Sequence, residues 1–510
     1  MTSRDSFLQP KVTILRSVIF ILISLLSAPG VRPQQSVKKL QLASEVRAEF
    51  LHAWNGYKKY AWGHDDLKPL SKTYHDWYAE PLLMTPVDAL DTMILMGFKD
   101  EANRTREYIA KNLSFDKNID VQTFEITIRL LGGLLSSYQL TGDKRLLDLA
   151  EDLGNRLLPV FDSPTGLPYR YVNLKTGKVR GNITNPAEAG TLLIEFGTLS
   201  KLTHRLVFFD KAKRALVEIY KRRSPIGLVG TWINVETGQW TDSDSHISGA
   251  IDSYYEYLLK CAILFDDQDC RRMWNESIAA ITKYLAQKVD RFSRWLGLPA
   301  NTENPQGRNE LWYGHADMNT GKRTATTYGA LDAFFPAVLA LSGDLKRASL
   351  LQESSYKMWM KHGIEPEEIN YQTMEVTSPG YPLRPEIIES TYYLYHYAIA
   401  DVRLKSIGRS KLGARTSRPQ SSTTLDPDHY QQMGAMMFRD FVKYCRTDEG
   451  YAALKSVVTK EKSDSMQSFL FAETFKYFYL LFAPPMALNF DKVIFNTEAH
   501  PIRKHFSAGK

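Results

Sequence analysis

A short turn recurs along this chain, and each copy joins two segments whose apolar residues have helical spacing. Five copies are MGFKDEANRT near residue 96, LTGDKRLLDLA near 140, LTHRLVFFDKA near 202, LFDDQDCRRMW near 264 and LSGDLKRASLL near 341. Successive copies lie about 45 to 75 residues apart, which is typical of a repeated helical hairpin with variable insertions. Strand-like alternation is confined to short stretches between the helices. The sequence therefore predicts a mainly α-helical fold whose hairpins either stack as a solenoid or close into a ring.

Lone carboxylates lie inside the apolar helical segments, one or two in each. A buried carboxylate is costly unless it is paired, hydrogen-bonded or bound to a metal. The residues fall in the first helix of each hairpin, as an inner ring of helices around one acidic cavity would require. They are Asp88, Asp91, Glu125, Glu188, Asp252, Glu256, Glu386, Glu389 and Glu473. This placement favours the closed ring and predicts an active site at its centre.

Composition narrows the class of protein. The 510 residues are 44% hydrophobic and include three cysteines, so the chain is not a disulfide scaffold. Proximity in sequence favours one bridge, between Cys261 and Cys270, which leaves Cys445 as an odd thiol. The formal charge of +7 is spread along the chain without a nucleic-acid-binding motif, so no nucleic-acid partner is expected. We predict a single catalytic domain over residues 36–505.

Two segments depart from the helical pattern. Residues 17–28, SVIFILISLLSA, form an apolar run inside a predicted signal peptide at residues 1–30. The run is short for a membrane span, although a retained signal anchor is the alternative. Residues 406–424 are basic and Ser-rich where a further turn is expected, which predicts a disordered insertion or an artefact of the sequence. The expected location is the secretory-pathway lumen, in the endoplasmic reticulum or Golgi, or outside the cell.

Glu125 and Glu386 have opposite expected protonation. Apolar neighbours predict that desolvation raises the pKa of Glu125, as in a general acid. An ion pair with Arg129, four residues on, is the structural alternative. Glu386 follows Pro385 in the first turn of a helix, where free N–H groups favour the ionised form expected of a base.

These carboxylates, with abundant aromatic residues as stacking platforms, fit hydrolysis of a glycosidic bond. For an inverting enzyme the acid and base carboxyls are expected to lie roughly 6.5–9.5 Å apart, which leaves room for water. A hard cation such as calcium also suits an oxygen-rich cavity without thiols. Sequence spacing alone does not choose between these uses.

Several motifs resemble the class I α-1,2-mannosidases of glycoside hydrolase family 47. The similarity extends over residues 53–501 apart from the insertion. It rests on WGHDDLKPLS, VDALDTM, FEITIRLLGGLLSSYQLTGD, DSYYEYLLK, YPLRPEIIES, SFLFAETFKYFYLLF and FNTEAHP. The resemblance implies an (αα)7 toroidal barrel with short β-hairpin insertions. It also implies calcium-dependent, inverting removal of terminal α-1,2-linked mannose from high-mannose N-glycans.

The resemblance assigns roles to particular residues. Glu125 matches the acid, Glu386 the base, and Asp252 a catalytic carboxylate that helps to organise water. Thr497 matches the calcium ligand, which binds through its hydroxyl and carbonyl oxygens; the residue types alone would make it a turn or cap residue. The pocket residues implied are Arg129, Glu188, Arg384, Glu389, Phe469, Glu473 and Glu498.

Departures from the family pattern bear on specificity. Ile251 precedes Asp252 where the endoplasmic-reticulum processing enzymes have Arg, Ala330 lies in TTYGALDAFFP, which replaces their KMDHLVCFLP, and Gln467 stands in place of an acidic residue. These changes motivate a second hypothesis, a catalytically weak, lectin-like factor that binds mannose in glycoprotein quality control. The expected partners are high-mannose glycans or glycoproteins, and the expected state is a monomer. The sequence leaves open which mannose is removed and whether an oxidoreductase partner is required.

Overall fold

A computed structural model describes residues 33–290, 310–410 and 425–505 of the chain. The predicted signal peptide at 1–30 lies outside these residues, as does most of the expected insertion at 406–424. Residues 406–410 form the end of helix α16 (Glu386–Ser410). Within the described part of the chain, no helix has both the length and the apolar character that crossing a membrane requires.

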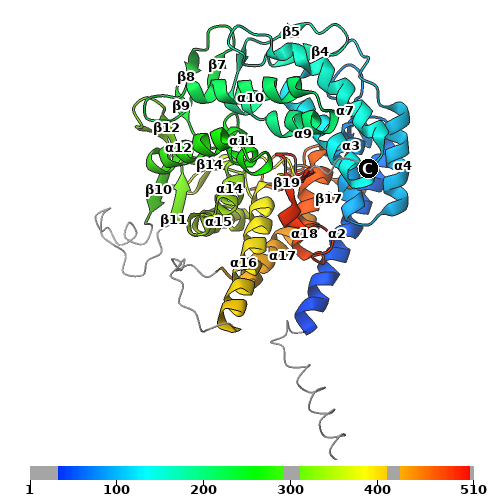
Figure 1. Ribbon diagram of the computed structural model, residues 1–510. Coiled ribbons are helices and arrows are strands. Elements are labelled where there is room, and N and C mark those ends of the chain that lie inside the picture. The colour runs from blue at the N-terminus through cyan, green and yellow to red at the C-terminus, as the bar shows by residue number, and fades with distance from the viewer. Residues whose placement is uncertain (1–32, 291–309, 411–424, 506–510) are drawn as a thin grey trace, which may run out of the picture.

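Seven helix pairs form the body of the described structure (Figure 1). The inner helices are α3 (Met84–Leu95), α6 (Gly132–Thr141), α9 (Leu193–Thr203), α11 (Asp252–Leu264), α14 (Phe335–Ser342), α16 and α18 (Phe475–Phe482). Their outer partners, in the same order, are α4 (Lys99–Asn112), α7 (Lys144–Leu157), α10 (Leu206–Lys221), α12 (Gln268–Tyr284), α15 (Leu345–His362), α17 (Pro427–Cys445) and α2 (Pro33–Tyr60). The five recurring turns of the sequence each join an inner helix to its outer partner, as predicted.

The inner helices close into a ring. Each contacts the next around the ring, and α3 contacts the short helix η4 (Leu470–Thr474) that leads directly into α18. The last inner helix, α18, packs on α2, the first described helix of the chain. The fold is therefore a closed (αα)7 barrel, and the solenoid alternative is wrong.

Inner and outer helices differ in sequence as their positions require. In α18 every residue is buried, since one face meets the outer layer and the other meets the barrel interior. The outer helix α7 instead buries one stripe, which includes Leu146, Ala150, Leu153 and Leu157, and exposes its charged face. Such a stripe is the expected pattern for a helix with solvent on one side.

Short strands lie between the outer helix of one pair and the inner helix of the next. The three-stranded sheets have the orders β3-β4-β5, β6-β7-β8, β13-β12-β9 and β14-β15-β16. Their strands are β3 (Asp120–Gln122), β4 (Tyr171–Asn173), β5 (Val179–Arg180), β6 (Ile183–Thr184), β7 (Trp232–Asn234), β8 (Trp240–Asp242), β9 (Asp244–Ser245), β12 (His315–Asp317), β13 (Arg323–Ala325), β14 (Thr327–Gly329), β15 (Glu368–Asn370) and β16 (Glu375–Ser378). Because these connections precede the inner helices, they gather at the end of the barrel where the inner helices begin.

Four antiparallel two-stranded sheets complete the β structure of the described residues. They pair β1 (Asp66–Lys68) with β2 (Thr73–His75), β10 (Ala286–Val289) with β11 (Glu310–Tyr313), β17 (Arg446–Thr447) with β18 (Gly450–Tyr451), and β19 (Val493–Phe495) with β20 (Pro501–Arg503). The remaining short helical segments are α5 (Thr123–Ile126), η1 (Thr127–Leu131), η2 (Leu158–Phe161), α8 (Pro186–Gly190), η3 (Leu331–Phe334) and η5 (Phe490–Lys492).

The cysteines are arranged as proximity suggested. Cys261 on α11 and Cys270 on α12 form a disulfide that closes the turn of this helix pair. Cys445, at the end of α17, is buried and free.

Candidate active site

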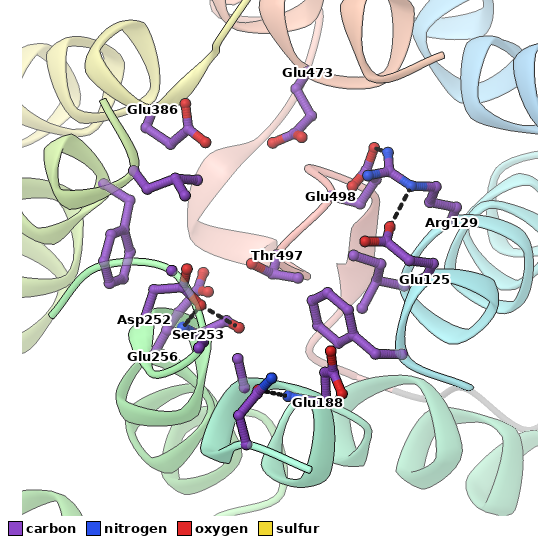
Figure 2. A pocket seen from close by; sticks show the side chains of 18 of the residues that line it. Glu125, Arg129, Glu188, Asp252, Ser253, Glu256, Glu386, Glu473, Thr497 and Glu498 are labelled. Carbon is purple, nitrogen blue, oxygen red and sulfur yellow. Dashed lines mark hydrogen bonds and ion pairs between the residues drawn. The ribbon is translucent and has the colours of Figure 1, made fainter. Parts of the chain in front are cut away.

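A cavity of about 360 Å³ lies at the centre of the ring. Seven of the nine predicted carboxylates line it: Glu125, Glu188, Asp252, Glu256, Glu386, Glu389 and Glu473. Arg129, Arg384, Thr497 and Glu498 line it as well. Figure 2 shows Glu386 and Asp252 on one side, Glu125 and Arg129 across from them, and Thr497 between. The expected convergence on one acidic cavity is confirmed for these seven residues.

Asp88 and Asp91 are not part of the cavity lining, which corrects the prediction for them. Both are fully buried on α3. Asp91 accepts a hydrogen bond from Ser136 Oγ at 2.8 Å and pairs with Lys476 Nζ at 2.8 Å and His500 Nδ1 at 2.7 Å. Asp88 Oδ1 lies 3.3 Å from His500 Nε2. These two carboxylates stabilise the packing of α3 against the C-terminal segment.

The fold places cavity residues at the beginnings of inner segments. Asp252 and Glu386 are the first residues of α11 and α16, and Glu188 lies in the first turn of α8. Arg129 and Glu473 lie instead on π-helical turns, η1 and η4. A π turn changes the direction of the side chains that follow it and is frequent at functional sites. The sequence carried no evident signal for these two turns.

Burial determines the protonation of Glu386 and Asp252. Burial raises the pKa of Glu386 to about 7, against the opposing charge of Arg384. Burial raises the pKa of Asp252 to about 6, although the backbone N–H and hydroxyl of Ser253 donate to it. Sequence position predicted an ionised Glu386 at a helix N-terminus. Desolvation raises the pKa above its usual range, an effect that the helix position alone did not predict.

Arg129 links several carboxylates on the opposite side of the cavity. Its Nε donates to Glu125 Oε2 at 2.9 Å, and its Nη1 pairs with Glu498 Oε1 and lies 3.8 Å from Asp88 Oδ2. The predicted ion pair between Glu125 and Arg129 is therefore present. Glu125 nevertheless keeps 23% of its side-chain surface exposed and lines the cavity, together with its apolar neighbours Phe124 and Ile128.

A β-hairpin brings Thr497 into the cavity. Ile494 pairs with Ile502 and Phe495 with Pro501, so residues 496–500 form the tip. Asn496 Nδ2 donates to the Ile128 carbonyl and to Glu195 Oε1, both at 2.8 Å, and the Thr497 N–H donates to Tyr257 Oη at 3.2 Å. Buried hydrogen bonds from several inner segments thus fix the hairpin tip.

The cavity around Thr497 is rich in oxygen atoms and short of positive charge. Burial raises the pKa of Glu389 and Glu498 to about 8 and raises the pKa of Glu473 well above its usual range. Glu256 pairs with Lys260, but its Oε2 has no hydrogen-bond partner. Among the described residues no His or Cys lines the cavity. Hard cations prefer such oxygen donors, so these residues fit a calcium-like ion.

Other predicted and unpredicted residues surround the acidic centre. Phe469 is 4% exposed and is not part of the lining; its ring lies 5.6 Å from the Arg129 guanidinium. Arg384 makes a bidentate pair with Glu367, with both contacts at 2.9 Å. Residues that the sequence did not single out also line the cavity, among them Gln122, Asn185, Trp232, Leu331 and Phe334. They lie on short strands, a loop and the single turn of η3, which are too short to show a periodic pattern, so no sequence signal identified them.

Glu188 illustrates how an unpredicted residue acts on a predicted one. Arg170 pairs with both Glu188 oxygens, at 2.5 and 2.6 Å, and Gln122 Nε2 donates to Glu188 Oε1 at 2.9 Å. Arg170 and Gln122 come from a loop and a strand distant in sequence from α8. Glu188 is therefore held in one orientation at the cavity wall.

A closed helical barrel around a cluster of carboxylates and aromatic side chains fits a protein of the glycoside hydrolase class. Comparisons identify the family within this class. The sequence profile of glycosyl hydrolase family 47 matches residues 49–411 and 423–504, and its gap falls within the expected insertion. The chain belongs to glycosyl hydrolase family 47 and is a glycoside hydrolase.

Individual relatives agree with this assignment. Alpha-mannosidase I MNS5 of Arabidopsis thaliana is 34% identical, over 92% of this chain and 78% of that protein. The endoplasmic reticulum mannosyl-oligosaccharide 1,2-alpha-mannosidase of Rattus norvegicus is 35% identical, over 93% of this chain and 72% of that protein. ER degradation-enhancing alpha-mannosidase-like protein 2 of Mus musculus is 34% identical, over 90% of this chain and 77% of that protein. The solved alpha-1,2-mannosidase from Trichoderma reesei superposes with a TM-score of 0.75 at 27% identity, covering 91% of this chain and 99% of that one.

Proposed function

We propose that this protein is a calcium-dependent, inverting exo-α-1,2-mannosidase that trims terminal mannose from high-mannose N-glycans. The observation that supports it best is the convergence of seven predicted carboxylates on one cavity beside Thr497, in a chain of glycosyl hydrolase family 47. Relatives named as 1,2-alpha-mannosidases support the choice of linkage and sugar. The proposed catalytic domain is a single unit over residues 36–505.

Glu386 is the proposed general base. A base works best when its pKa lies near the working pH, and burial places that of Glu386 at about 7. Its side chain lines the cavity and keeps 14% of its surface exposed, so the carboxylate can accept a proton from water. Asp252 lies on the same side of the cavity and would help to orient this water (Figure 2). The water attacks the anomeric carbon, and its proton passes to Glu386.

Glu125 is the proposed general acid on the opposite side of the cavity. It would protonate the leaving oxygen, either directly or through a water molecule. The positive charge of Arg129 is not available to Glu125 alone, because the guanidinium also faces Glu498 and Asp88. Attack on one face and protonation on the other give inversion when the carboxyls are separated by a water-sized gap.

The remaining polar residues of the lining are proposed to bind the sugar. Arginine and carboxylate groups at a cavity wall offer directional hydrogen bonds to hydroxyl groups. The residues are Arg129, Glu188, Arg384, Glu389 and Glu473, with Phe469 behind Arg129. Their orientation is fixed by partners outside the cavity, such as Arg170 for Glu188 and Glu367 for Arg384.

Thr497 is the proposed calcium ligand, through its hydroxyl and carbonyl oxygens. The surrounding carboxylates and the unpartnered Glu256 Oε2 fit a hard divalent cation. Bound calcium supplies positive charge that orients hydroxyl groups of the sugar in the cavity. The hydrogen bonds of Asn496 and Tyr257 hold the hairpin tip in place for this role.

The test is incubation of the purified protein with a nine-mannose glycan, with and without a calcium chelator, followed by proton NMR of the released sugar. We expect release of β-mannose that stops on chelation. Glu125→Gln and Glu386→Gln should each lower turnover by about 10²- to 10⁴-fold while leaving the thermal unfolding profile intact. Glu353→Gln, on the outer helix α15, is the matched control. Retained turnover in both cavity variants would contradict the assignment of Glu125 and Glu386. Glycan binding without release would favour the lectin-like alternative.

The proposed location is the lumen of the secretory pathway, with the protein as a monomer. The relatives named for the endoplasmic reticulum support it, as does the disulfide between Cys261 and Cys270. The four N-glycosylation sequons are also exposed, at Asn103, Asn112, Asn182 and Asn275. Sensitivity of the expressed protein to an endoglycosidase, seen as a mobility shift on a gel, tests the location.

A further inference from the structure

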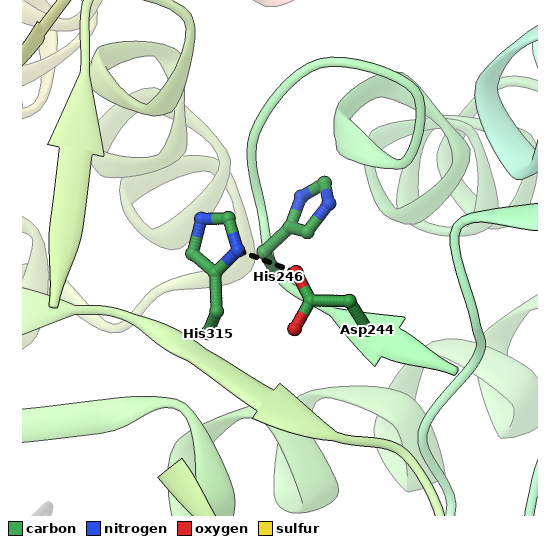
Figure 3. Close-up of side chains that lie close together, drawn as sticks. All are labelled: Asp244, His246 and His315. Atoms are coloured by element: carbon green, nitrogen blue, oxygen red, sulfur yellow. Dashed lines mark hydrogen bonds and ion pairs between the residues drawn. The ribbon is translucent and has the colours of Figure 1, made fainter. Parts of the chain in front are cut away.

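Asp244, His246 and His315 form a cluster outside the carboxylate cavity (Figure 3). Each offers one potential ligand atom, and these atoms lie within 4.8 Å of one another. Asp244 belongs to β9, His246 follows it, and His315 begins β12. None of the three has a role in the proposed hydrolysis.

The sheet explains why these side chains meet. β9 pairs with β12 so that Asp244 faces Asp317 and Ser245 faces Ala316, which places His315 beside His246. Side chains two residues apart on a strand share a face, so Asp244, His246 and His315 project from the same side. The two imidazole rings lie 4.4 Å apart between centroids. The pairing register of β9 and β12 thus brings the three side chains together.

We propose that Asp244, His246 and His315 bind a divalent cation of the zinc type. Two imidazoles and one carboxylate match the ligand set that zinc takes when water completes its coordination. Tetrahedral zinc places its ligand atoms roughly 3.4 Å apart, a spacing that the atoms of this cluster, all within 4.8 Å of one another, would adopt around the ion. Calcium, which prefers six to eight oxygen ligands, does not match this nitrogen-rich set.

Neighbouring hydroxyl groups hold the ligands in suitable orientations. Thr324 Oγ1 donates to Asp244 Oδ1 at 2.6 Å, while Asp244 Oδ2 faces His315 Nδ1 at the same distance. His315 Nε2 lies 3.2 Å from Thr327 Oγ1. Without an ion, His315 Nδ1 donates its proton to Asp244 Oδ2, so a bound cation would take the place of that proton. Such outer partners are a regular feature of protein metal sites.

Burial and access also suit a cation. His246 is 6% exposed and its nitrogens have only long contacts, at 3.2 Å to Thr231 Oγ1 and to the Ser248 N–H. Asp244 and His315 keep 30% and 17% of their side-chain surface exposed, which gives an ion a path to the cluster.

The cluster adjoins the loop that leads into α11, whose first residue is Asp252. The Ser248 N–H contacts His246, and the Ser248 carbonyl accepts from the Asp252 N–H at 3.0 Å. Gly249 and Ala250 of the same loop line the carboxylate cavity. A cation at the cluster would therefore anchor the wall of the cavity from behind.

Zinc titration of the full-length, disulfide-bonded protein tests the proposal. Isothermal titration calorimetry is carried out with zinc chloride in saturating calcium, which keeps zinc from the carboxylate cavity. We expect one equivalent of zinc to bind. His315→Gln should weaken binding at least about 100-fold, and Thr324→Val, which removes only an outer hydrogen bond, about tenfold.

The matched control is His429→Gln, which removes a different His–carboxylate pair, with Glu353 at 2.6 Å, and should leave zinc affinity unchanged. Circular dichroism melting of each metal-free variant shows whether it folds, and Thr324→Val provides the test if His315→Gln does not. Absence of zinc binding by the unaltered protein, or equal affinity in a folded cluster variant, overturns the proposal. The cluster would then be only an ion pair that ties β9 to β12.

Discussion

Arg129 holds together the carboxylates on one side of the cavity. Its guanidinium contacts Glu125 and Glu498 and lies near Asp88, and both Trp77 and Phe469 flank it, at 5.1 and 5.6 Å. Arginine can serve several carboxylates at once because its donors form a rigid planar fork. One side chain thereby offsets much of the charge on this side of the cavity.

Replacing this arginine should be strongly destabilising. Arg129→Met leaves Glu498 buried without its cation, and breaking a buried pair in this way typically costs about 3–5 kcal/mol. Urea unfolding followed by circular dichroism measures the loss. Arg104→Met, which removes an exposed partner of Glu101, should cost far less because solvent screens that pair. Equal losses in the two variants would contradict this account of Arg129.

His500 should make the free energy of unfolding fall as the pH becomes alkaline. Burial alone lowers its pKa, but Asp91 and Asp88 outweigh this and raise the pKa to about 9. The stabilisation is therefore complete below the unfolded pKa of about 6.5 and is lost as the pH rises through about 9, a loss of roughly 3 kcal/mol. Urea unfolding of wild type and His500→Gln across this range checks the sign. The difference between the two proteins should shrink as the pH rises, and a difference that grows would refute it.

At the scale of residues, the sequence identified the cavity carboxylates better than it predicted the surroundings of each side chain. The motifs placed Glu125, Asp252 and Glu386 together in one cavity, as the structure has them. The protonation argument for Glu386 was incomplete, because position in a helix says nothing about the other elements that bury this carboxyl. Asp88 and Asp91 were misplaced for a related reason, since their partner His500 is about 410 residues away in the chain.

At the scale of elements, the packing of α6 against the β19–β20 hairpin sets the position of Thr497. A Cβ on Gly132 would lie 2.5 Å from Asn496 Nδ2 and 3.1 Å from His500 Cδ2. The absence of a side chain therefore lets the hairpin tip reach the helix. Asn496 in turn holds the tip by its bonds to Ile128 and Glu195.

Gly132→Ala should displace this hairpin. Overpacking of this kind costs about 1–3 kcal/mol, and the shift should also weaken the proposed calcium site. The measurement is the calcium concentration that restores activity after chelation, which we expect to rise. Gly380→Ala is the control, because a Cβ there would lie 3.5 Å or more from its neighbours. An unchanged calcium requirement in Gly132→Ala would show that the helix does not position the tip.

The sequence predicted the helices better than it predicted which strands pair. Each recurring turn joins two helices in the structure because 3.6-residue periodicity and turn chemistry are local properties. The pairing of β9 with β12 joins residues about 70 positions apart, and both strands are only two or three residues long. Nothing local specifies such a pairing. The His–Asp cluster that depends on it therefore had no sequence signal.

At the scale of the whole molecule, closure of the ring depends on α2. Val46, Phe50, Trp54 and Tyr57 of this helix are fully buried. Phe50 packs against Phe471 and Phe475, with centroid distances of 5.2 and 5.8 Å. The helix that comes first in the described chain thus covers the inner helix that comes last.

Removal of residues 33–60 should prevent cooperative folding, since α18 would expose its apolar outer face. The milder variant Phe50→Ala should fold but lose about 3–5 kcal/mol of unfolding free energy. Urea titrations monitored by tryptophan fluorescence distinguish the two outcomes. A single sharp transition in the truncated chain, at the same urea concentration as the intact one, would mean that the ring does not need its closing helix.

The β19–β20 hairpin has a consequence for biosynthesis. Thr497 and Glu498 follow every helix of the ring in chain order, although they lie at its centre. At about 5 to 20 residues per second, Glu125 leaves the ribosome tens of seconds before Thr497 is made. The helix pairs can therefore assemble on the nascent chain while the cavity still lacks its central residues. The cavity can therefore be complete only after this final hairpin has been made and has packed between the helices.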